Sequence, residues 1–160
     1  MQRLATLLGA ATVFAITPMT AQSQVLLGPT LAWHDDADLG IGATVGLELP
    51  ALSQGVGFLG DLLIFFPDGF DYWELNGNLT YDFPLAESTV LPFALGGLNI
   101  GHSSGGGPGS DGNTDVSLNL GGGIAFDAGR FRPKAGGRFV LGDGTSIVLF
   151  ITLPFRVGAS

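Results

Sequence analysis

The chain has 160 residues, a formal net charge of −8 and a sequence pI near 4.3, which fits one domain and disfavours binding to a nucleic-acid backbone. It has no cysteine, which excludes disulfides, thiolate metal sites and cysteine nucleophiles. Hydrophobic residues make up 46% of the chain but charged residues only 12%, about half the share found in an ordinary soluble domain. Such a scarcity of charge leaves little to solvate the exposed face of a soluble β protein.

Residues 1–23 have the order of features found in an export signal. The opening "MQR" carries a positive charge, Leu4 to Ile16 form a short apolar run, and "AQS" at 21–23 is a small-x-small cleavage site. The apolar run is too short to cross a bilayer as a helix. We therefore expect a signal peptide at 1–23 and a mature domain at 24–160, with a buried first helix as the alternative.

Beyond residue 24, stretches of about ten residues alternate with turn sequences rich in Gly, Pro, Asp and Ser. None of these stretches has a convincing period of 3.6, so no helix is predicted in the mature domain. Eight strands are predicted instead, at residues 25–34, 39–49, 56–66, 72–83, 89–101, 116–127, 132–142 and 146–156.

The fourth stretch, "YWELNGNLTYDF" at 72–83, shows the common pattern. One set of alternate residues runs from Trp73 to Phe83 and is apolar, whereas the other runs from Tyr72 to Asp82 and is mostly polar. A period of two indicates a strand with two different faces. In all eight stretches one phase can be chosen that holds no charged residue and no amide.

The opposite phase holds glycines and a set of long polar side chains. If this face were exposed to water, small residues would dominate the solvated side of the sheet, which is a poor choice for solubility. In a narrow closed barrel, glycines alternating with a few polar side chains would fit the interior. We therefore predict a polar network in the lumen formed by Glu48, Asp61, Glu74, Asn76, Asn78, Asp82, Asn119, Asp127, Arg132, Lys134, Arg138 and Arg156.

Three features indicate that the apolar face meets lipid. The strands have the roughly 9–11 residues that a tilted transmembrane strand needs. Eight antiparallel strands can close and satisfy every backbone hydrogen bond, which a bilayer demands. Aromatic residues of the apolar face gather toward strand ends, as in an interfacial girdle: Trp33, Phe66 and Trp73 at one rim, and Phe58, Tyr81, Phe83, Phe126 and Phe155 at the other.

In these features the chain resembles the small eight-stranded outer-membrane barrels of Gram-negative bacteria, of the OmpA, OmpX and opacity-protein type. The resemblance covers 24–160 and is clearest in "LPFALGGLNIG" at 91–101, "GGGIAFD" at 121–127 and the stretch 132–155. It implies an all-β, up-and-down transmembrane barrel in the outer membrane, with lipid, lipopolysaccharide and the assembly machinery as partners. Such chains usually end on an aromatic residue, whereas "RVGAS" follows Phe155 here.

With the N-terminus in the periplasm, the connections after the first, third, fifth and seventh strands face outward. They carry most of the acidic excess: Asp35, Asp36, Asp38, Asp68, Asp71, Asp111, Asp115 and Asp143. Inside the lumen, buried charges need partners, so we expect Arg138 and Asp61 near mid-height and the other charges toward the periplasmic end. This network is interpreted as a plug that fills the interior, or alternatively as a gate or proton path.

Two motifs have weak functional interpretations. "GIGATVG" at 40–46 lacks the spacing and the following helix of a dinucleotide-binding loop, so lumen glycines explain it better. "DGNTD" at 111–115 begins like a calcium loop but lacks the glycine at the sixth position and the closing glutamate. A solvated acidic loop is the favoured interpretation, with a weak divalent site bridging to lipopolysaccharide phosphates as the alternative.

"GHSS" at 101–104 is the one enzymatic motif to weigh. Outer-membrane lipid A deacylases form a similar barrel and use a His-x-Ser pair followed by Asn, whereas here Gly105 follows His102 and Ser104. No acid is clearly placed to orient His102. We therefore predict a non-enzymatic protein without metal or cofactor, with an envelope-structural or surface-interaction role. The alternatives are a lipid A hydrolase, a narrow channel and a soluble periplasmic binding barrel.

Overall fold

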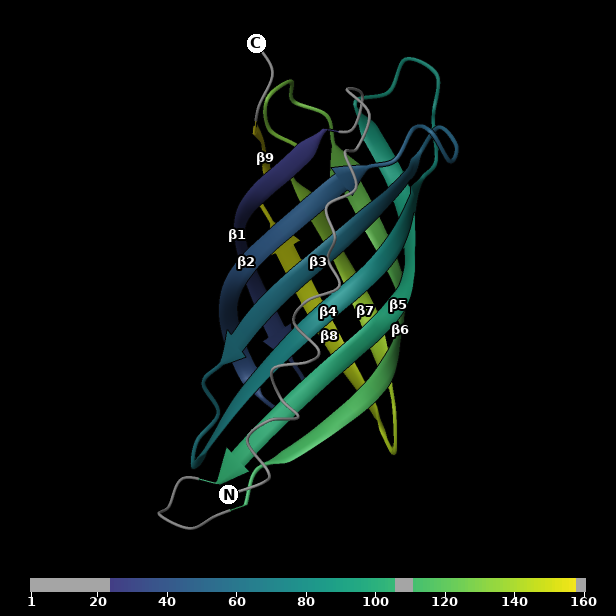
Figure 1. Cartoon of the computed structure of the whole chain (residues 1–160). Coiled ribbons are helices and arrows are strands. Elements are labelled where there is room, and N and C mark those ends of the chain that lie inside the picture. The colour runs from purple at the N-terminus through teal and green to yellow at the C-terminus, as the bar shows by residue number, and fades with distance from the viewer. Residues whose placement is uncertain (1–23, 106–110, 158–160) are drawn as a thin grey trace, which may run out of the picture.

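The computed structural model describes residues 24–105 and 111–157, which form one elongated barrel of tilted strands (Figure 1). The predicted signal peptide at 1–23 lies outside the described residues. Within them, no helix is long and apolar enough to cross a bilayer. The strands are β1 (Val25–His34), β2 (Asp38–Glu48), β3 (Val56–Phe65), β4 (Phe70–Asp82), β5 (Val90–Gly105), β6 (Asn113–Phe126), β7 (Lys134–Leu141), β8 (Thr145–Thr152) and β9 (Phe155–Val157).

From β1 to β8, each strand pairs antiparallel with the next one along the chain, and β1 closes the barrel by pairing with β2 on one side and with β8 and β9 on the other. Closure leaves no open sheet edge along the wall, which is what a β structure in lipid requires. The predicted all-β, eight-stranded, up-and-down barrel is therefore confirmed.

The predicted strand bounds differ from the structure in three places. The last strand, expected at 146–156, is interrupted at Leu153 and Pro154 because proline has no N–H for the ladder. The Arg132 backbone N–H still donates to the Pro154 carbonyl at 2.9 Å, in the register of the β7–β8 ladder, although β7 itself begins at Lys134. The strands β5 and β6 are longer than expected and reach furthest at the lower end of the barrel in Figure 1.

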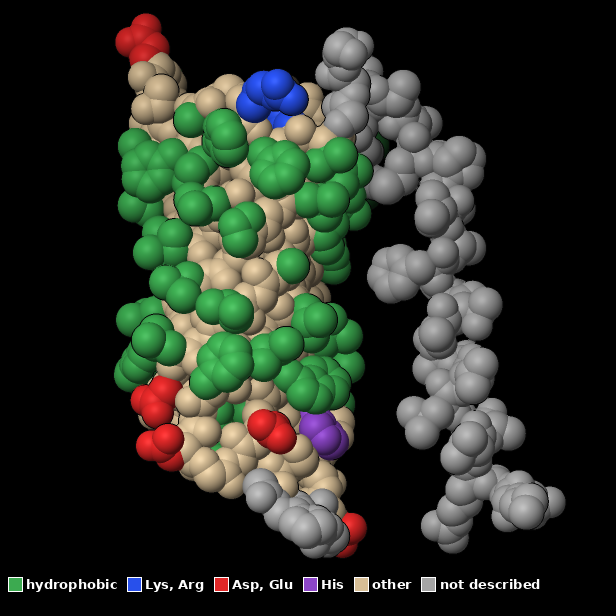
Figure 2. All heavy atoms as spheres, turned by 90° about the vertical axis from the view of Figure 1, so that its left-hand side faces the viewer, with side chains coloured by type: hydrophobic (Ala, Val, Ile, Leu, Met, Phe, Trp, Pro, Cys, Tyr) green, Lys and Arg blue, Asp and Glu red, His purple; other side chains and the backbone are tan. Residues whose placement is uncertain are grey.

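The predicted apolar phase faces outward on every strand. Large apolar side chains with about half of their surface exposed lie along the wall, among them Leu31, Ile64, Leu98, Leu120 and Ile151. Figure 2 shows apolar side chains covering one side of this wall, with acidic side chains at the lower end. The acidic end of the barrel, as we call it, carries the turns after β1, β3, β5 and β7.

The interior is less polar than predicted. Between the polar side chains, a set of buried apolar residues packs inside the barrel, comprising Leu59, Leu63, Phe65, Phe93, Leu95, Val140, Val148 and Phe150. These residues belong to the inward phase but were not part of the predicted lumen network. Eight strands leave an interior that side chains can just fill, and apolar residues fill whatever the hydrogen-bonded groups do not.

Small residues are needed where the backbones of neighbouring strands approach closely. A Cβ atom built on Gly97 of β5 would lie 2.1 Å from the carbonyl oxygen of Gly77 on β4. That distance is far inside van der Waals contact, and the obstacle is backbone that cannot swing aside. Gly97 therefore lets β4 and β5 curve around the narrow lumen.

Candidate functional site in the barrel interior

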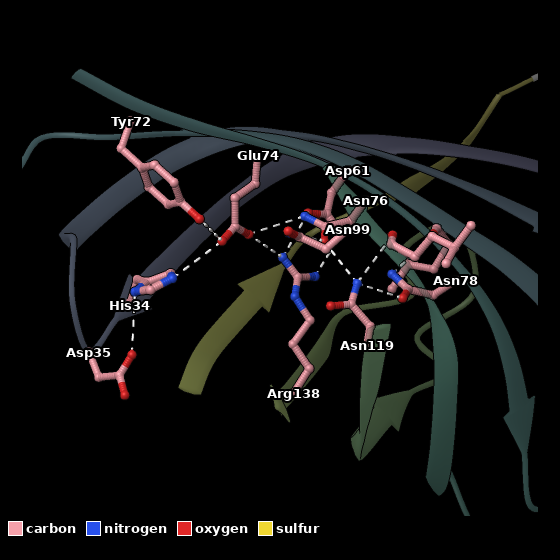
Figure 3. Close-up of polar contacts among 12 residues, drawn as sticks. His34, Asp35, Asp61, Tyr72, Glu74, Asn76, Asn78, Asn99, Asn119 and Arg138 are labelled. Atoms are coloured by element: carbon pink, nitrogen blue, oxygen red, sulfur yellow. Dashed lines mark hydrogen bonds and ion pairs between the residues drawn. The ribbon is translucent and has the colours of Figure 1, made fainter. Parts of the chain in front are cut away.

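The polar centre of the barrel is built by strand register. In the ladder, Asp61 of β3 lies opposite Asn76 of β4, and Asn76 lies opposite Asn99 of β5. Because alternate residues share a face, Glu74 and Asn78 point inward beside Asn76. From the far side of the barrel, Arg138 of β7 extends toward this row (Figure 3).

Arg138 is the only cation in this central cluster and is 2% exposed. Its two terminal nitrogens donate to the two Asp61 carboxylate oxygens at 3.0 and 3.1 Å, and Nη2 also donates to Glu74 at 3.3 Å. The guanidinium lies over the Phe150 ring, with 5.6 Å between the guanidinium carbon and the ring centroid. A planar guanidinium that donates two parallel hydrogen bonds to one carboxylate forms a strong ion pair with a fixed orientation.

Glu74 is completely buried and four side chains contact its carboxylate, one of which is Asn76, whose Nδ2 donates to Oε2 at 3.3 Å. In addition to Arg138, the Tyr72 hydroxyl donates to Glu74 Oε1 at 2.9 Å, and His34 Nε2 lies 3.4 Å from the same oxygen. His34 Nδ1 accepts the Asp36 backbone N–H at 3.0 Å. That acceptor role leaves Nε2 as the nitrogen that carries hydrogen toward Glu74 in the neutral ring.

A ladder of asparagine side chains extends the cluster across the lumen. Asn99 and Asn119 both donate to the Asn76 side-chain oxygen, at 2.9 and 2.8 Å. Asn119 also donates to the Asn78 side-chain oxygen at 3.0 Å, and Asn76 donates to Asp61 at 2.9 Å. Amides have both donors and acceptors, so they can relay hydrogen bonds between strands without adding charge.

A second ionic cluster lies at the opposite end of the barrel from the acidic turns. Asp82 accepts from Arg132 at 2.8 Å and from Lys134 at 2.9 Å. Glu48 pairs with Arg132 and lies 3.6 Å from Arg156, whose second acidic neighbour, Asp127, is 3.8 Å away. Three acids thus meet three bases, and the cluster is formally neutral.

The twelve predicted residues fall into these two clusters, but not with the division expected, and Asp127 is exposed at the rim beyond the end of β6 and does not lie in the lumen. Glu74 was expected toward the periplasmic end, and it lies instead with Arg138 and Asp61 because of its place in the β4 register. His34, Tyr72 and Asn99 were missing from the predicted network. All three are on the predicted polar phase of their strands, but alternation alone does not show that they meet Glu74, because that depends on register between β1, β4 and β5.

The aromatic residues predicted for the girdle lie on the outer face. Trp33, Phe66, Tyr81, Phe83, Phe126 and Phe155 are each at least 39% exposed, and Tyr81 and Phe83 pack edge to face. Trp73 is half-buried because its ring stacks on His102, with centroids 5.4 Å apart. Phe58 is half-buried because its ring lies against Gly60 and Gly77 of the wall.

The contacts of His102 do not form a nucleophile and base pair. Its Nδ1 lies 2.7 Å from the Thr114 hydroxyl, and its ring faces Trp73. Among the described residues, neither Ser104 nor a carboxylate contacts His102. A serine hydrolase needs its base against the nucleophile and an orienting partner behind the base, and neither relationship is present here.

Only one group of potential metal ligands is found among the described residues, at His34, Asp35 and Asp36. Its groups already have partners: Ser146 donates to Asp36 at 2.9 Å, and the Ile147 backbone N–H donates to Asp35 at 3.0 Å. The acids of "DGNTD" do not form such a group within that part of the chain. The interior chemistry is therefore that of a hydrogen-bonded packing centre.

Comparison with known proteins gives the fold context. No family model and no curated protein matches the chain. Among solved structures, it is similar to the N-terminal β-barrel domain of Pseudomonas aeruginosa OprF (TM-score 0.71, 13% identity) and to Neisserial surface protein A (TM-score 0.65, 17% identity). It is also similar to Ail, the attachment invasion locus protein of Yersinia pestis (TM-score 0.56, 17% identity). Each match covers 84% of this chain and 97% of the other, so the chain has the fold of small outer-membrane barrels.

Proposed function

We propose that this chain is an integral outer-membrane protein with a non-enzymatic role in envelope structure or surface interaction. It is exported through a cleaved signal peptide, inserted by the outer-membrane assembly machinery, and surrounded by lipid and lipopolysaccharide. Its acidic end faces the cell exterior.

The observation that carries this proposal is the inverted distribution of polarity. Arg138, Asp61 and Glu74 are at most 5% exposed, whereas leucines and phenylalanines along the wall are about half exposed. In water this arrangement would expose a continuous apolar belt, which soluble monomers avoid. In a bilayer the same belt meets hydrocarbon, and the buried ions find partners inside the closed sheet.

The packing of the interior favours a structural role over conduction. At mid-height the lumen is crossed by Glu74, Asn78, Leu63 and Val148, all with 0% exposure. Ion pairs and amide hydrogen bonds join most of the polar groups there, although Asn119 Oδ1 and Arg138 Nε have no hydrogen-bond partner, and side chains take the place of a water column. We therefore expect no steady ionic current when the folded protein is incorporated in a planar bilayer, and a steady conductance would contradict the filled lumen.

The charge of the acidic end restricts the surface partner. The turns at 35–37, 66–69 and 142–144 contain aspartates but neither lysine nor arginine. Ail has been crystallised with the heparin analogue sucrose octasulfate, a polyanion. An acidic end repels such a ligand, so we propose that surface contacts of this chain are made with cationic groups.

Fractionation of cells that produce the full chain tests the proposal. The protein should remain with outer membranes after alkaline washing, and its electrophoretic mobility should change on boiling because a closed barrel resists detergent until heated. The matched control is a periplasmic soluble protein, which the wash releases. Recovery of the chain in the soluble fraction, with no mobility change, would overturn the membrane assignment.

A further inference from the structure

A small cavity opens at the acidic end of the barrel, between the acidic turns and the central cluster. Its volume is about 180 Å³, too small for a drug-sized ligand but enough for a group of a few heavy atoms. Residues of β1, β4, β5, β6, β7 and β8 and of the turn after β7 line it, including His34, Tyr72, Asn99, Ser103, Asp115 and Asp143.

The residues that line the cavity offer hydrogen-bond acceptors and negative charge but no lysine or arginine side chain. Asp115 and Asp143 are exposed carboxylates at the rim, and neither lysine nor arginine lines the cavity. Deeper in the cavity, the Tyr72 hydroxyl donates its hydrogen to Glu74. Its oxygen can therefore only accept a hydrogen bond from a group in the cavity. The nearest guanidinium, that of Arg138, is already occupied by Asp61 and Glu74.

Asn99 gives an independent indication of a ligand. It is 2% exposed, and its Nδ2 donates to Asn76, which fixes the orientation of the side-chain amide. Its Oδ1 lies on the side of Gly101, another residue that lines the cavity, and accepts no hydrogen bond from any described residue. Because this oxygen is open to the cavity and has no donor among the described residues, it is available to a ligand that donates a hydrogen bond.

We propose that this cavity binds a primary alkylammonium group. An ammonium ion has three donors and one positive charge, which match the Asn99 and Tyr72 oxygens and the two carboxylates. Val140 and the glycines of the lining give an apolar wall against which methylene groups can pack. A divalent metal fits less well, because it needs six or more oxygen ligands in close geometry and Asp115 and Asp143 do not belong to a group of potential metal ligands among the described residues.

The site can be tested on the folded full chain in detergent micelles at constant ionic strength. Butylamine serves as a free amine and Nα-acetyl-lysine N-methylamide as a lysine side chain, with calorimetry and the side-chain amide resonance of Asn99 as measurements. Saturable binding of either probe with a shift of that resonance supports the proposal, and the probe that binds more tightly identifies the source of the ammonium. Binding of neither probe overturns it.

Two comparisons separate the site from general charge attraction. Tetramethylammonium carries the charge but no donor, so it should bind at least tenfold more weakly than butylamine. The Asp115→Asn variant should weaken the binding of butylamine about tenfold, as expected for the loss of one charge-assisted hydrogen bond. Asp68→Asn removes one negative charge from the same end of the barrel but outside the cavity, so it should change the affinity for butylamine less than twofold. The proposal would be overturned if the two variants changed the affinity for butylamine equally, or if tetramethylammonium bound as tightly as butylamine.

A cavity-filling variant gives a test that leaves the charge unchanged. A Cβ on Gly101 would lie 2.9 Å from the Tyr72 hydroxyl and would narrow the cavity. The Gly101→Ala variant should therefore weaken butylamine while keeping the boiling-dependent mobility change of the folded barrel. Unchanged binding in the folded variant would place the ammonium elsewhere.

Discussion

Arg138 and Asp61 are 77 residues apart in the sequence and meet in the barrel centre through two parallel hydrogen bonds of 3.0 and 3.1 Å. Glu74 shares the same guanidinium. The three groups are almost completely buried, so each charge depends on the others for its compensation.

Replacing Arg138 by methionine is expected to destabilise the barrel by about 3–5 kcal/mol, because it leaves two buried carboxylates without a cation. Urea unfolding in detergent, followed by the fluorescence of Trp33 and Trp73, measures the change. The control is Arg130→Met in the exposed turn after β6, which should cost less than about 0.5 kcal/mol.

A compensating variant keeps this prediction informative if the single variant does not fold. Adding Asp61→Asn to Arg138→Met removes one of the two stranded charges and should restore part of the lost stability. Equal stability of the Arg138→Met and Arg130→Met proteins would show that the central ion pair contributes nothing.

The two tyrosines of the chain offer a matched pair for the hydrogen bond to Glu74. Tyr72→Phe removes the donor at 2.9 Å from the buried carboxylate and should cost about 1.5–3 kcal/mol. Tyr81 is on the lipid-facing wall, 39% exposed, and Tyr81→Phe should change stability far less. The same urea titration measures both, and a larger loss for Tyr81→Phe would contradict the assigned role of Tyr72.

Barrel closure depends on a close approach at Gly28. A Cβ there would lie 2.3 Å from the Leu153 carbonyl oxygen and 2.5 Å from the Pro154 Cα, where β1 meets the break between β8 and β9. Gly28→Ala should therefore cost about 1–3 kcal/mol and lower the temperature at which the folded band is lost on gels. Gly144→Ala, with nothing within 4 Å of its Cβ, is the control and should leave that temperature unchanged.

The fold could be predicted because its signal is local. The alternation in 72–83 assigns Leu75 and Leu79 to one face and Asn76 and Asn78 to the other, and burial in the structure follows that division. The interruption at Pro154 was also readable, since proline cannot donate to a ladder.

The site was harder to predict because it depends on register between strands. Alternation shows that Glu74 points inward but not its height relative to Arg138, which is set by the pairings along four successive strands. Phe65 and Phe150 are similar cases. Alternation shows that both side chains point inward. It does not show that their rings pack inside the lumen beside an ion pair, because that depends on the volume that the polar groups leave unfilled.

The orientation of the two faces can be tested on a single strand. Leu120 lies in the middle of the outward apolar residues of β6, which run from Val116 to Phe126, and is 54% exposed. In lipid vesicles, Leu120→Arg should cost about 2–4 kcal/mol because it places a charge at the bilayer midplane, whereas Val116→Arg near the acidic end should cost about 0–1 kcal/mol. Denaturant titration of the refolded variants in vesicles gives both values. If the wall faced water, arginine at either exposed position would be tolerated equally, so equal stability of the two variants would reverse the assignment of the faces.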